Sequence, residues 1–341
     1  EGDIMVQIEV WDRLDFARSV WLKTPSRPAN NVNYTPRDSS LQNEYPNHPG
    51  SNENRFFFSV PGLDNNPVLL KYQHAQVDRM LAISLGYPNV LYCMDNETSG
   101  RAEWGAYWAG YIRTKAKDAG VEVQVTEMWD PWDIKDRVHR RTLDHPELYT
   151  FIDISQNNHN KGQAHWDNLQ WAREYISKKP RPLNHVKIYG ADGGNFGNDR
   201  DGVERFWRGL LGGAASIRFH RPPAGIGLSE KAQAHLRSAR MLLEKFDILR
   251  AVADARSERL GERSDNEAYL SVIEGGPYAV YFPDGGAVTL QVADDVPEKL
   301  TLAWLDIAAS RWSEEESLSS AGRTVSLKTP AGGPWVALLR R

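Results

Sequence analysis

The feature of the sequence that most constrains its fold is an alternation of short apolar runs with longer amphipathic stretches over most of its 341 residues. This alternation is typical of βα units around a parallel sheet, whose strands are nearly all apolar because helices cover both faces. Six strands are expected, at residues 4–11, 90–94, 121–126, 149–155, 185–190 and 215–219. Helices are expected at residues 67–85, 103–119, 167–177, 201–211 and 229–246. The sequence therefore predicts an α/β fold.

Two other segments break this pattern. Residues 21–67 are dominated by Asn, Pro, Ser and Asp, so we expect a long binding loop that builds no core. After residue 255 the pattern changes to short alternating strands separated by turn signals, which indicates a small antiparallel β-sandwich. We therefore expect a catalytic (β/α) barrel domain at residues 1–255 and a β-sandwich domain at residues 256–341.

Composition narrows the classes of partner. The 41 Lys and Arg residues nearly balance the 45 Asp and Glu residues, so a nucleic-acid partner is not expected. No apolar run approaches the roughly 20 residues of a membrane span, so no membrane partner is expected either. The single cysteine, Cys93, permits neither an internal disulfide nor a cysteine pair for zinc. The 12 Trp and 13 Tyr residues suit stacking on sugar rings, although buried aromatic residues would give the same count.

Polar residues follow the expected strands, at the end of a parallel barrel where ligands bind. An Asp in such a place can simply cap a helix, but capping needs only one residue per helix. We therefore expect a polar functional rim that binds carbohydrate. The candidate substrate-binding residues are Asp12, Asn96, Glu127, Trp129, Trp132, Asn157, His159, Trp166 and His220.

Two carboxyl groups are the candidate catalytic pair. Hydrolysis of a glycosidic bond needs one carboxyl group that protonates the leaving oxygen and a second that acts as nucleophile or activates water. Glu97 is the candidate acid, because Asn96 beside it can hydrogen-bond a sugar hydroxyl. Asp192 is the candidate partner, because the neighbouring glycines permit close approach of a substrate. Glu127 and Asp153 are alternatives for this second carboxylate.

The motif Asn96-Glu97 after the strand at residues 90–94 resembles the fourth-strand signature of the clan A (β/α)8 glycoside hydrolases. In that clan the Glu is the acid/base of a retaining mechanism. Residues 72–81, 87–90, 206–208 and 212–215 are similar, in this order, to the bacterial apiosidase-like barrels. Those proteins carry a C-terminal β-sandwich of a type named for collagen binding, which residues 304–312 and 330–339 resemble.

This resemblance implies a TIM-type (β/α)8 barrel whose third strand is residues 4–11, so the first two βα units are missing from the chain. We therefore expect the natural protein to be longer, or the chain to be a fragment. The family usually places a Glu nucleophile at its seventh strand, where this chain has Asp192, which is one methylene shorter. The resemblance implies a secreted or periplasmic hydrolase of plant or bacterial polysaccharides or oligosaccharides, without a cofactor or metal.

Two other functions compete with this interpretation. A non-catalytic carbohydrate-binding barrel protein would fit the missing strands and the Asp at position 192. Metal-assisted hydrolysis would use His159, His165, Asp153 and Asp167, but their spacing matches no established ligand pattern. The sequence predicts neither the sugar and linkage nor the oligomeric state.

Overall fold

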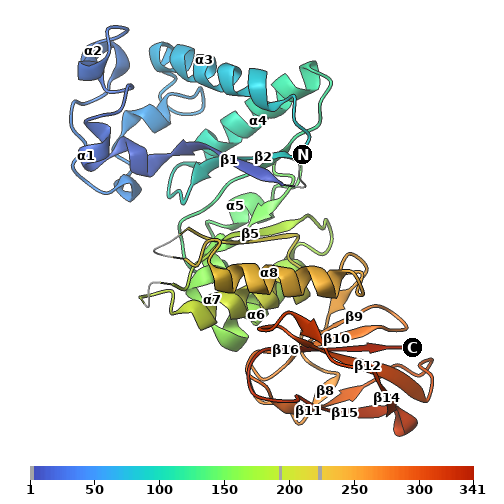
Figure 1. Ribbon diagram of the computed structural model, residues 1–341. Helices are drawn as coiled ribbons and strands as arrows, with labels where there is room; N and C mark the ends of the chain where they lie inside the picture. The colour runs from blue at the N-terminus through green and yellow to red at the C-terminus, as the bar shows by residue number, and fades with distance from the viewer. Residues whose placement is uncertain (1–3, 192–193, 222–224) are drawn as a thin grey trace. The chain divides into compact units, whose positions relative to one another are not determined.

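The computed structural model describes residues 4–191, 194–221 and 225–341 (Figure 1). The chain folds into two compact units. Unit 1 comprises Glu1–Asp153 and Lys179–Arg181, and unit 2 comprises Ile154–Lys178 and Pro182–Arg341. The boundary between the units thus falls within the α/β pattern, and the domain division at residue 255 stays a prediction.

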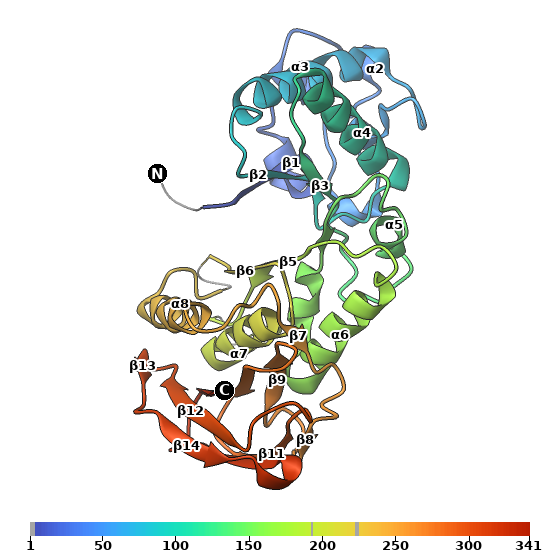
Figure 2. The ribbon, with the colours of Figure 1, turned by 90° about the vertical axis from the view of Figure 1, so that its right-hand side faces the viewer.

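Unit 1 is built on a parallel sheet with the strand order β1-β2-β3. Its strands are β1 (Val6–Asp12), β2 (Val90–Asn96) and β3 (Gln124–Thr126), and β4 (Ile152–Asp153) ends the main segment of the unit. The helices α3 (Pro67–Ser84) and α4 (Ala102–Asp118) lie on the same side of β1 and β2 in both views, while α5 (Arg140–Leu143) is a single turn (Figures 1 and 2). Asp12 pairs with Asn96 across β1 and β2, so the carboxyl ends of these strands are level.

The long segment between β1 and α3 contains only short helices. They are η1 (Arg13–Phe16), α1 (Arg18–Trp21), η2 (Pro28–Asn30), α2 (Pro36–Ser39), η3 (Pro49–Ser51) and η4 (Arg55–Phe58). The prediction that residues 21–67 build no core is wrong. Tyr45, Phe56 and Phe57 are buried in the core of unit 1, where the Phe57 ring lies 5.1 Å from that of Trp104. A few large aromatic side chains are enough to anchor this polar segment.

Unit 2 begins with α/β elements. The strands β5 (Leu183–Ile188) and β6 (Ser216–Phe219) are parallel neighbours. The helical elements are η5 (Ser155–His159), α6 (Gly162–Tyr175), α7 (Asp199–Leu211) and α8 (Glu230–Leu243). A capping box between Asn198 and Asp201 begins α7, because each side chain accepts a hydrogen bond from the backbone of the other residue.

Two antiparallel sheets complete unit 2 (Figure 2). The larger has the order β13-β12-β16-β10-β9-β7 with β14 paired to β12, and the smaller has the order β15-β11-β8. The strands are β7 (Val252–Ala253), β8 (Leu260–Gly261), β9 (Tyr269–Val272), β10 (Tyr278–Phe282), β11 (Ala287–Gln291), β12 (Lys299–Asp306), β13 (Arg311–Trp312), β14 (Glu316–Ser319), β15 (Thr324–Lys328) and β16 (Trp335–Arg340), with the turn η6 (Ala321–Arg323) before β15. Apolar residues of both sheets share one core, as a β-sandwich requires.

The helices of unit 2 pack directly on the larger antiparallel sheet. Trp207 of α7 stacks on Tyr281 of β10 with 5.8 Å between ring centroids, and Trp166 of α6 lies 4.7 Å from Tyr269 of β9. Side chains from the helices and this sheet therefore form one hydrophobic core. The expected α/β elements and the antiparallel sheets are present, whereas closure of a (β/α)8 barrel and the absence of two βα units stay predictions.

Candidate active site

The carboxyl ends of β1 and β2 bring Asp12 and Asn96 together, in the residues just before Glu97. Asn96 Nδ2 donates a hydrogen bond of 3.1 Å to Asp12 Oδ2. The other oxygen, Asp12 Oδ1, accepts a hydrogen bond of 2.9 Å from the Leu14 amide. Asp12 therefore fixes the orientation of the Asn96 side-chain amide at the end of the sheet.

Glu97 has an uncommon backbone conformation. Its φ angle is 43°, in the left-handed region that costs a residue with a Cβ roughly 1–2 kcal/mol. The next residue, Thr98, forms a parallel bridge with Trp129 in the segment after β3. The Thr98 amide donates to the Met128 carbonyl at 2.8 Å, and the Asp130 amide donates to the Thr98 carbonyl at 2.9 Å. Such strain persists where surrounding contacts fix the chain, which is common at functional sites.

A small hollow adjoins Glu97. It has a volume of about 50 Å³ and is lined by Arg13, Leu14, His48, Pro49, Gly50, Glu97, Ser99 and Asp130. A buried water needs roughly 10–15 Å³ of such space, so the hollow accommodates a few waters or a sugar hydroxyl rather than a whole sugar ring. The half-buried Glu97 side chain thus lines a small polar hollow that is large enough for a water or a sugar hydroxyl.

Two buried carboxyl groups lie near one another behind the residues that line this hollow, in β2 and just after β3. Asp95 of β2 is fully buried, and burial raises its pKa to about 6 against the opposing effect of the Arg13 guanidinium. Glu127 is 1% exposed, and burial together with the nearby Asp95 raises the pKa of its carboxyl well above the usual value. Among the described residues, none hydrogen-bonds Glu127 Oε1.

The Glu127 carboxyl lies against α4 at a glycine. A Cβ at position 105 would lie only 1.7 Å from Glu127 Oε2, so the backbone of Gly105 makes room for the acid. We expect Gly105→Ala to lower the free energy of unfolding by roughly 1–3 kcal/mol or more, because it overpacks a fixed buried site. Urea denaturation would measure this change.

Gly110 of the same helix provides the matched control. No atom lies within 4 Å of a Cβ at that position, so Gly110→Ala should stabilise the protein by about 0.5–1 kcal/mol through the ordinary helix preference for Ala. Equal effects of the two substitutions would contradict the close approach of Glu127 to α4.

The two other predicted residues of unit 1 differ in exposure. Trp129 is 2% exposed, and its Nε1 donates a hydrogen bond of 2.6 Å to Thr142 Oγ1. The guanidinium of Arg141 lies 5.1 Å from the Trp129 ring centroid. Trp132 is 63% exposed.

In unit 2, three predicted residues are buried in hydrogen-bonded or ring contacts. Asn157 Nδ2 donates to the His165 carbonyl at 2.9 Å, and Asn157 Oδ1 accepts from Asn160 and Asn168. Trp166 is fully buried and its Nε1 donates to the Ala255 carbonyl at 3.2 Å. The His220 ring is buried between the guanidinium groups of Arg218 and Arg221, at 3.1 and 2.8 Å from its two nitrogens.

The remaining predicted residues of unit 2 are His159 and Asp192. His159 is exposed, and its ring lies 4.8 Å from that of Phe196. Asp192 lies outside the described residues. The structure thus brings together Asp12, Asn96 and Glu97, while the binding roles of the residues in unit 2 stay predictions.

Arg13 and Asp95 are site residues that sequence reasoning did not select. Arg13 Nε donates a hydrogen bond of 2.7 Å to Asp95 Oδ2, although the residues are 82 positions apart. One sequence signal could have identified them. Both are charged residues inside or directly after an apolar strand, and a charge in such a place is rarely buried without a partner of opposite charge.

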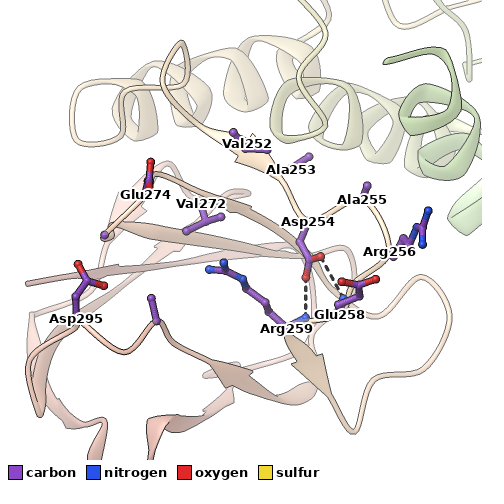
Figure 3. Close-up of a pocket in the computed structure, with 12 residues that line it drawn as sticks. Val252, Ala253, Asp254, Ala255, Arg256, Glu258, Arg259, Val272, Glu274 and Asp295 are labelled. Carbon is purple, nitrogen blue, oxygen red and sulfur yellow. Dashed lines mark hydrogen bonds between the residues drawn. The ribbon is translucent and has the colours of Figure 1, made fainter. Parts of the chain in front are cut away.

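A hollow of about 850 Å³ on the β-sandwich is a less suitable site (Figure 3). The carboxylate of Asp254 accepts hydrogen bonds from the Glu258 and Arg259 amides, and Asp295 pairs with Arg341 at 2.6 Å. The other charged side chains around it are exposed. The two aspartates are thus already paired within the protein, and the hollow contains no buried charged group aimed at a ligand among the described residues.

Among the described residues, no helix is both long and apolar enough to cross a membrane. In the same described part of the chain, no three His, Cys, Asp or Glu side chains gather in a group that could hold a metal ion.

Comparison with known proteins identifies similar folds. No family model and no curated protein matches the chain. A glycoside hydrolase family 5 structure from Bacteroides vulgatus matches with a TM-score of 0.58 and 16% identity over 79% of this chain and 66% of that chain. A second structure, described as a glycoside hydrolase, has a TM-score of 0.57 and 14% identity over 79% of this chain and 68% of that chain. An Anoxybacillus alpha-amylase structure has a TM-score of 0.50 and 11% identity over 81% of this chain and 64% of that chain.

These likenesses show the fold of the chain. They show that the chain shares a fold with these glycoside hydrolase structures, at identities too low to carry over an activity. The chain spans about two thirds of the length of the structures it matches.

Proposed function

We propose that the chain is a glycoside hydrolase in which Glu97 is the general acid/base. The observation that carries this proposal is the position of Glu97, directly after β2 and beside a polar hollow, with Asp12 orienting the adjacent Asn96. The carboxyl end of a parallel strand is where such folds place catalytic residues. The likeness to glycoside hydrolase structures supports the same reaction class.

The proposed reaction uses two carboxyl groups. Glu97 protonates the leaving glycosidic oxygen, and Asn96 hydrogen-bonds a hydroxyl of the bound sugar. Asp192 is the proposed nucleophile of a retaining mechanism, a role that rests on the resemblance to the apiosidase-like barrels. In the second step Glu97, now ionised, takes a proton from the water that releases the sugar.

The proposed substrate is a plant or bacterial polysaccharide or oligosaccharide. The exposed ring of Trp132 provides a surface on which a sugar can stack. Secretion or a periplasmic location would place the protein with such substrates and stays a prediction.

The test is hydrolysis of a panel of plant and bacterial glycans by the purified chain, followed through newly formed reducing ends. We expect sugar release from at least one glycan, with the anomeric configuration retained in the first product seen by NMR. Binding on a glycan array without any release would instead identify a non-catalytic carbohydrate-binding protein. Neither release nor binding would reject both functions.

A further inference from the structure

Arg13 forms the centre of a buried polar network beside the candidate acid. It follows β1 directly, is 4% exposed, and lines the same hollow as Glu97. Its Nε donates to Asp95 Oδ2 at 2.7 Å and to Thr98 Oγ1 at 2.8 Å. Asp95 lies two residues before Glu97 and Thr98 lies one residue after it. The guanidinium therefore binds the chain on both sides of the left-handed residue.

The same guanidinium also holds the loop whose residues His48, Pro49 and Gly50 line the hollow. Arg13 Nη1 donates to Asn52 Oδ1 at 3.1 Å, and Asn52 Nδ2 donates to the Ser99 carbonyl at 2.9 Å. The Arg13 guanidinium carbon lies 4.1 Å from the centroid of the Phe57 ring. One side chain thus joins the ends of β1 and β2 to the segment that begins at η3.

The chain leaves space for an arginine at this place. A Cβ at position 100 would lie 2.1 Å from Arg13 Nη2, so Gly100 allows the planar group to lie against the backbone. A lysine ammonium has neither the plane that stacks on Phe57 nor the fixed fork that reaches three acceptors. The network is therefore specific for arginine rather than for positive charge.

We propose that Arg13 is a positioning residue, which holds the Glu97 carboxyl and the loop around His48 in the arrangement that the reaction needs. This role rests on the proposed function, since it presupposes that Glu97 is the general acid/base. Arg13 acts through its hydrogen bonds to Asp95, Thr98 and Asn52 and not on the substrate. Small displacements of a catalytic group lower the rate strongly, while the affinity for the rest of the substrate changes less.

The test compares Arg13→Lys with Arg55→Lys. Arg55 is a matched control because it also pairs with an aspartate, Asp64 at 3.3 Å, and lies over a phenylalanine, Phe58 at 4.9 Å. We expect Arg13→Lys to lower kcat by about 100-fold with a much smaller change in KM, and Arg55→Lys to leave both unchanged. A kcat within twofold of the unsubstituted protein, or an equal loss in both variants, would overturn the proposal.

A second pair of variants covers the case in which Arg13→Lys does not fold. Thr98→Val keeps the size of the side chain and the backbone bridge but removes the oxygen that accepts from Arg13 Nε and from the Gly100 amide, so kcat should fall by about tenfold. Thr98→Ser restores the hydroxyl and should recover most of the rate. Equal rates in the Val and Ser variants would contradict positioning through this hydrogen bond.

Hydrogen exchange separates failure of this inference from failure of the proposed function. We expect Arg13→Lys to accelerate amide exchange by about tenfold in residues 48–54 and 96–100, with no change in Arg55→Lys. If the chain hydrolyses no glycan but exchange accelerates as expected, the proposed function fails and the network stands. If the chain hydrolyses a glycan and exchange is unchanged, the positioning role of Arg13 fails by itself.

Discussion

Substitution of Glu97 by Gln should lower kcat by about 10²–10⁴-fold while binding of the glycan is retained. The amide has the size of the carboxyl and still hydrogen-bonds a sugar, but it cannot give up a proton to the leaving oxygen. The measurement is kcat on the glycan that the panel identifies, together with the dissociation constant of the same glycan by calorimetry. An unchanged kcat would remove Glu97 from the reaction.

Two further variants exclude trivial causes of such a loss. Glu103→Gln removes an exposed carboxylate from the first turn of α4 and should leave kcat unchanged. Glu97→Gly abolishes the carboxyl as well but relieves the φ angle of 43°, so the protein should gain about 1 kcal/mol in stability. An inactive Glu97→Gly protein that is at least as stable as the unsubstituted one would show that the loss is chemical and not a loss of fold.

The sequence predicted those elements whose signal is local. The strands of both parallel sheets are apolar runs, and α3 and α7 begin at the caps Asn66 and Asn198. The short strands β7, β8, β13 and β14 were not predicted, because two to four residues carry no periodic pattern and depend on their partner strands. The buried aromatic residues between β1 and α3 were missed for a related reason. These aromatic residues have mostly polar neighbours in the sequence, so no local pattern indicates that tertiary packing buries them.

One part of the candidate site was predictable from a general rule: the carboxyl ends of neighbouring parallel strands lie at the same edge of the sheet. That rule placed Asp12 beside Asn96 and Glu97, as the pairing of β1 with β2 requires. It gave no means to decide which charged residues turn inward, since the ion pair between Arg13 and Asp95 joins segments that are 82 residues apart. Likewise, only the packing of α6 against β9 determines that Trp166 is fully buried.

Acidification from pH 6.5 to pH 4.5 should destabilise unit 2 by about 2–3 kcal/mol through the buried His185, and further through the buried His165. His165 of α6 and His185 of β5 are stacked with 5.1 Å between ring centroids, and both are essentially inaccessible to solvent. Among the described residues, none hydrogen-bonds either nitrogen of the His165 ring. Arg205 and Arg208 of α7 are the charged groups that oppose protonation of His165.

The sign follows from the pKa values of the folded protein. Burial, and then the neighbouring positive charges, lower the pKa of His165 well below its usual value and that of His185 to about 3. In the unfolded chain both rings take up a proton near pH 6.5, so below that pH only the unfolded state gains protons. Stability is therefore complete above pH 6.5 and falls by about 1.4 kcal/mol per pH unit and histidine until the folded pKa is reached.

Variants in which both rings are replaced, His165→Gln with His185→Gln, should show a weaker pH dependence. Their stability at pH 7 is lower because the new side chains pack less well, so the informative quantity is the slope with pH. Hydrogen exchange of the peptides from α6 and β5, corrected for the intrinsic effect of pH on the rate, measures this slope in unit 2 alone. An identical slope with and without the two histidines would contradict the prediction.

Unit 1 provides an internal control of opposite sign. The raised pKa values of Asp95 and Glu127 mean that their carboxyl groups are protonated in the folded unit at a pH where the unfolded chain is still ionised. Acidification toward pH 4.5 therefore stabilises the surroundings of β2 through these two groups. The ion pairs of Glu204 in unit 2 persist over this range, because Arg200 and Arg208 hold the pKa of its carboxyl below the usual value against burial. Exchange should thus accelerate in α6 and β5 before it accelerates in β2 and α4. Simultaneous acceleration in all four elements would mean that the two units unfold together, with the loss in unit 2 outweighing the gain in unit 1.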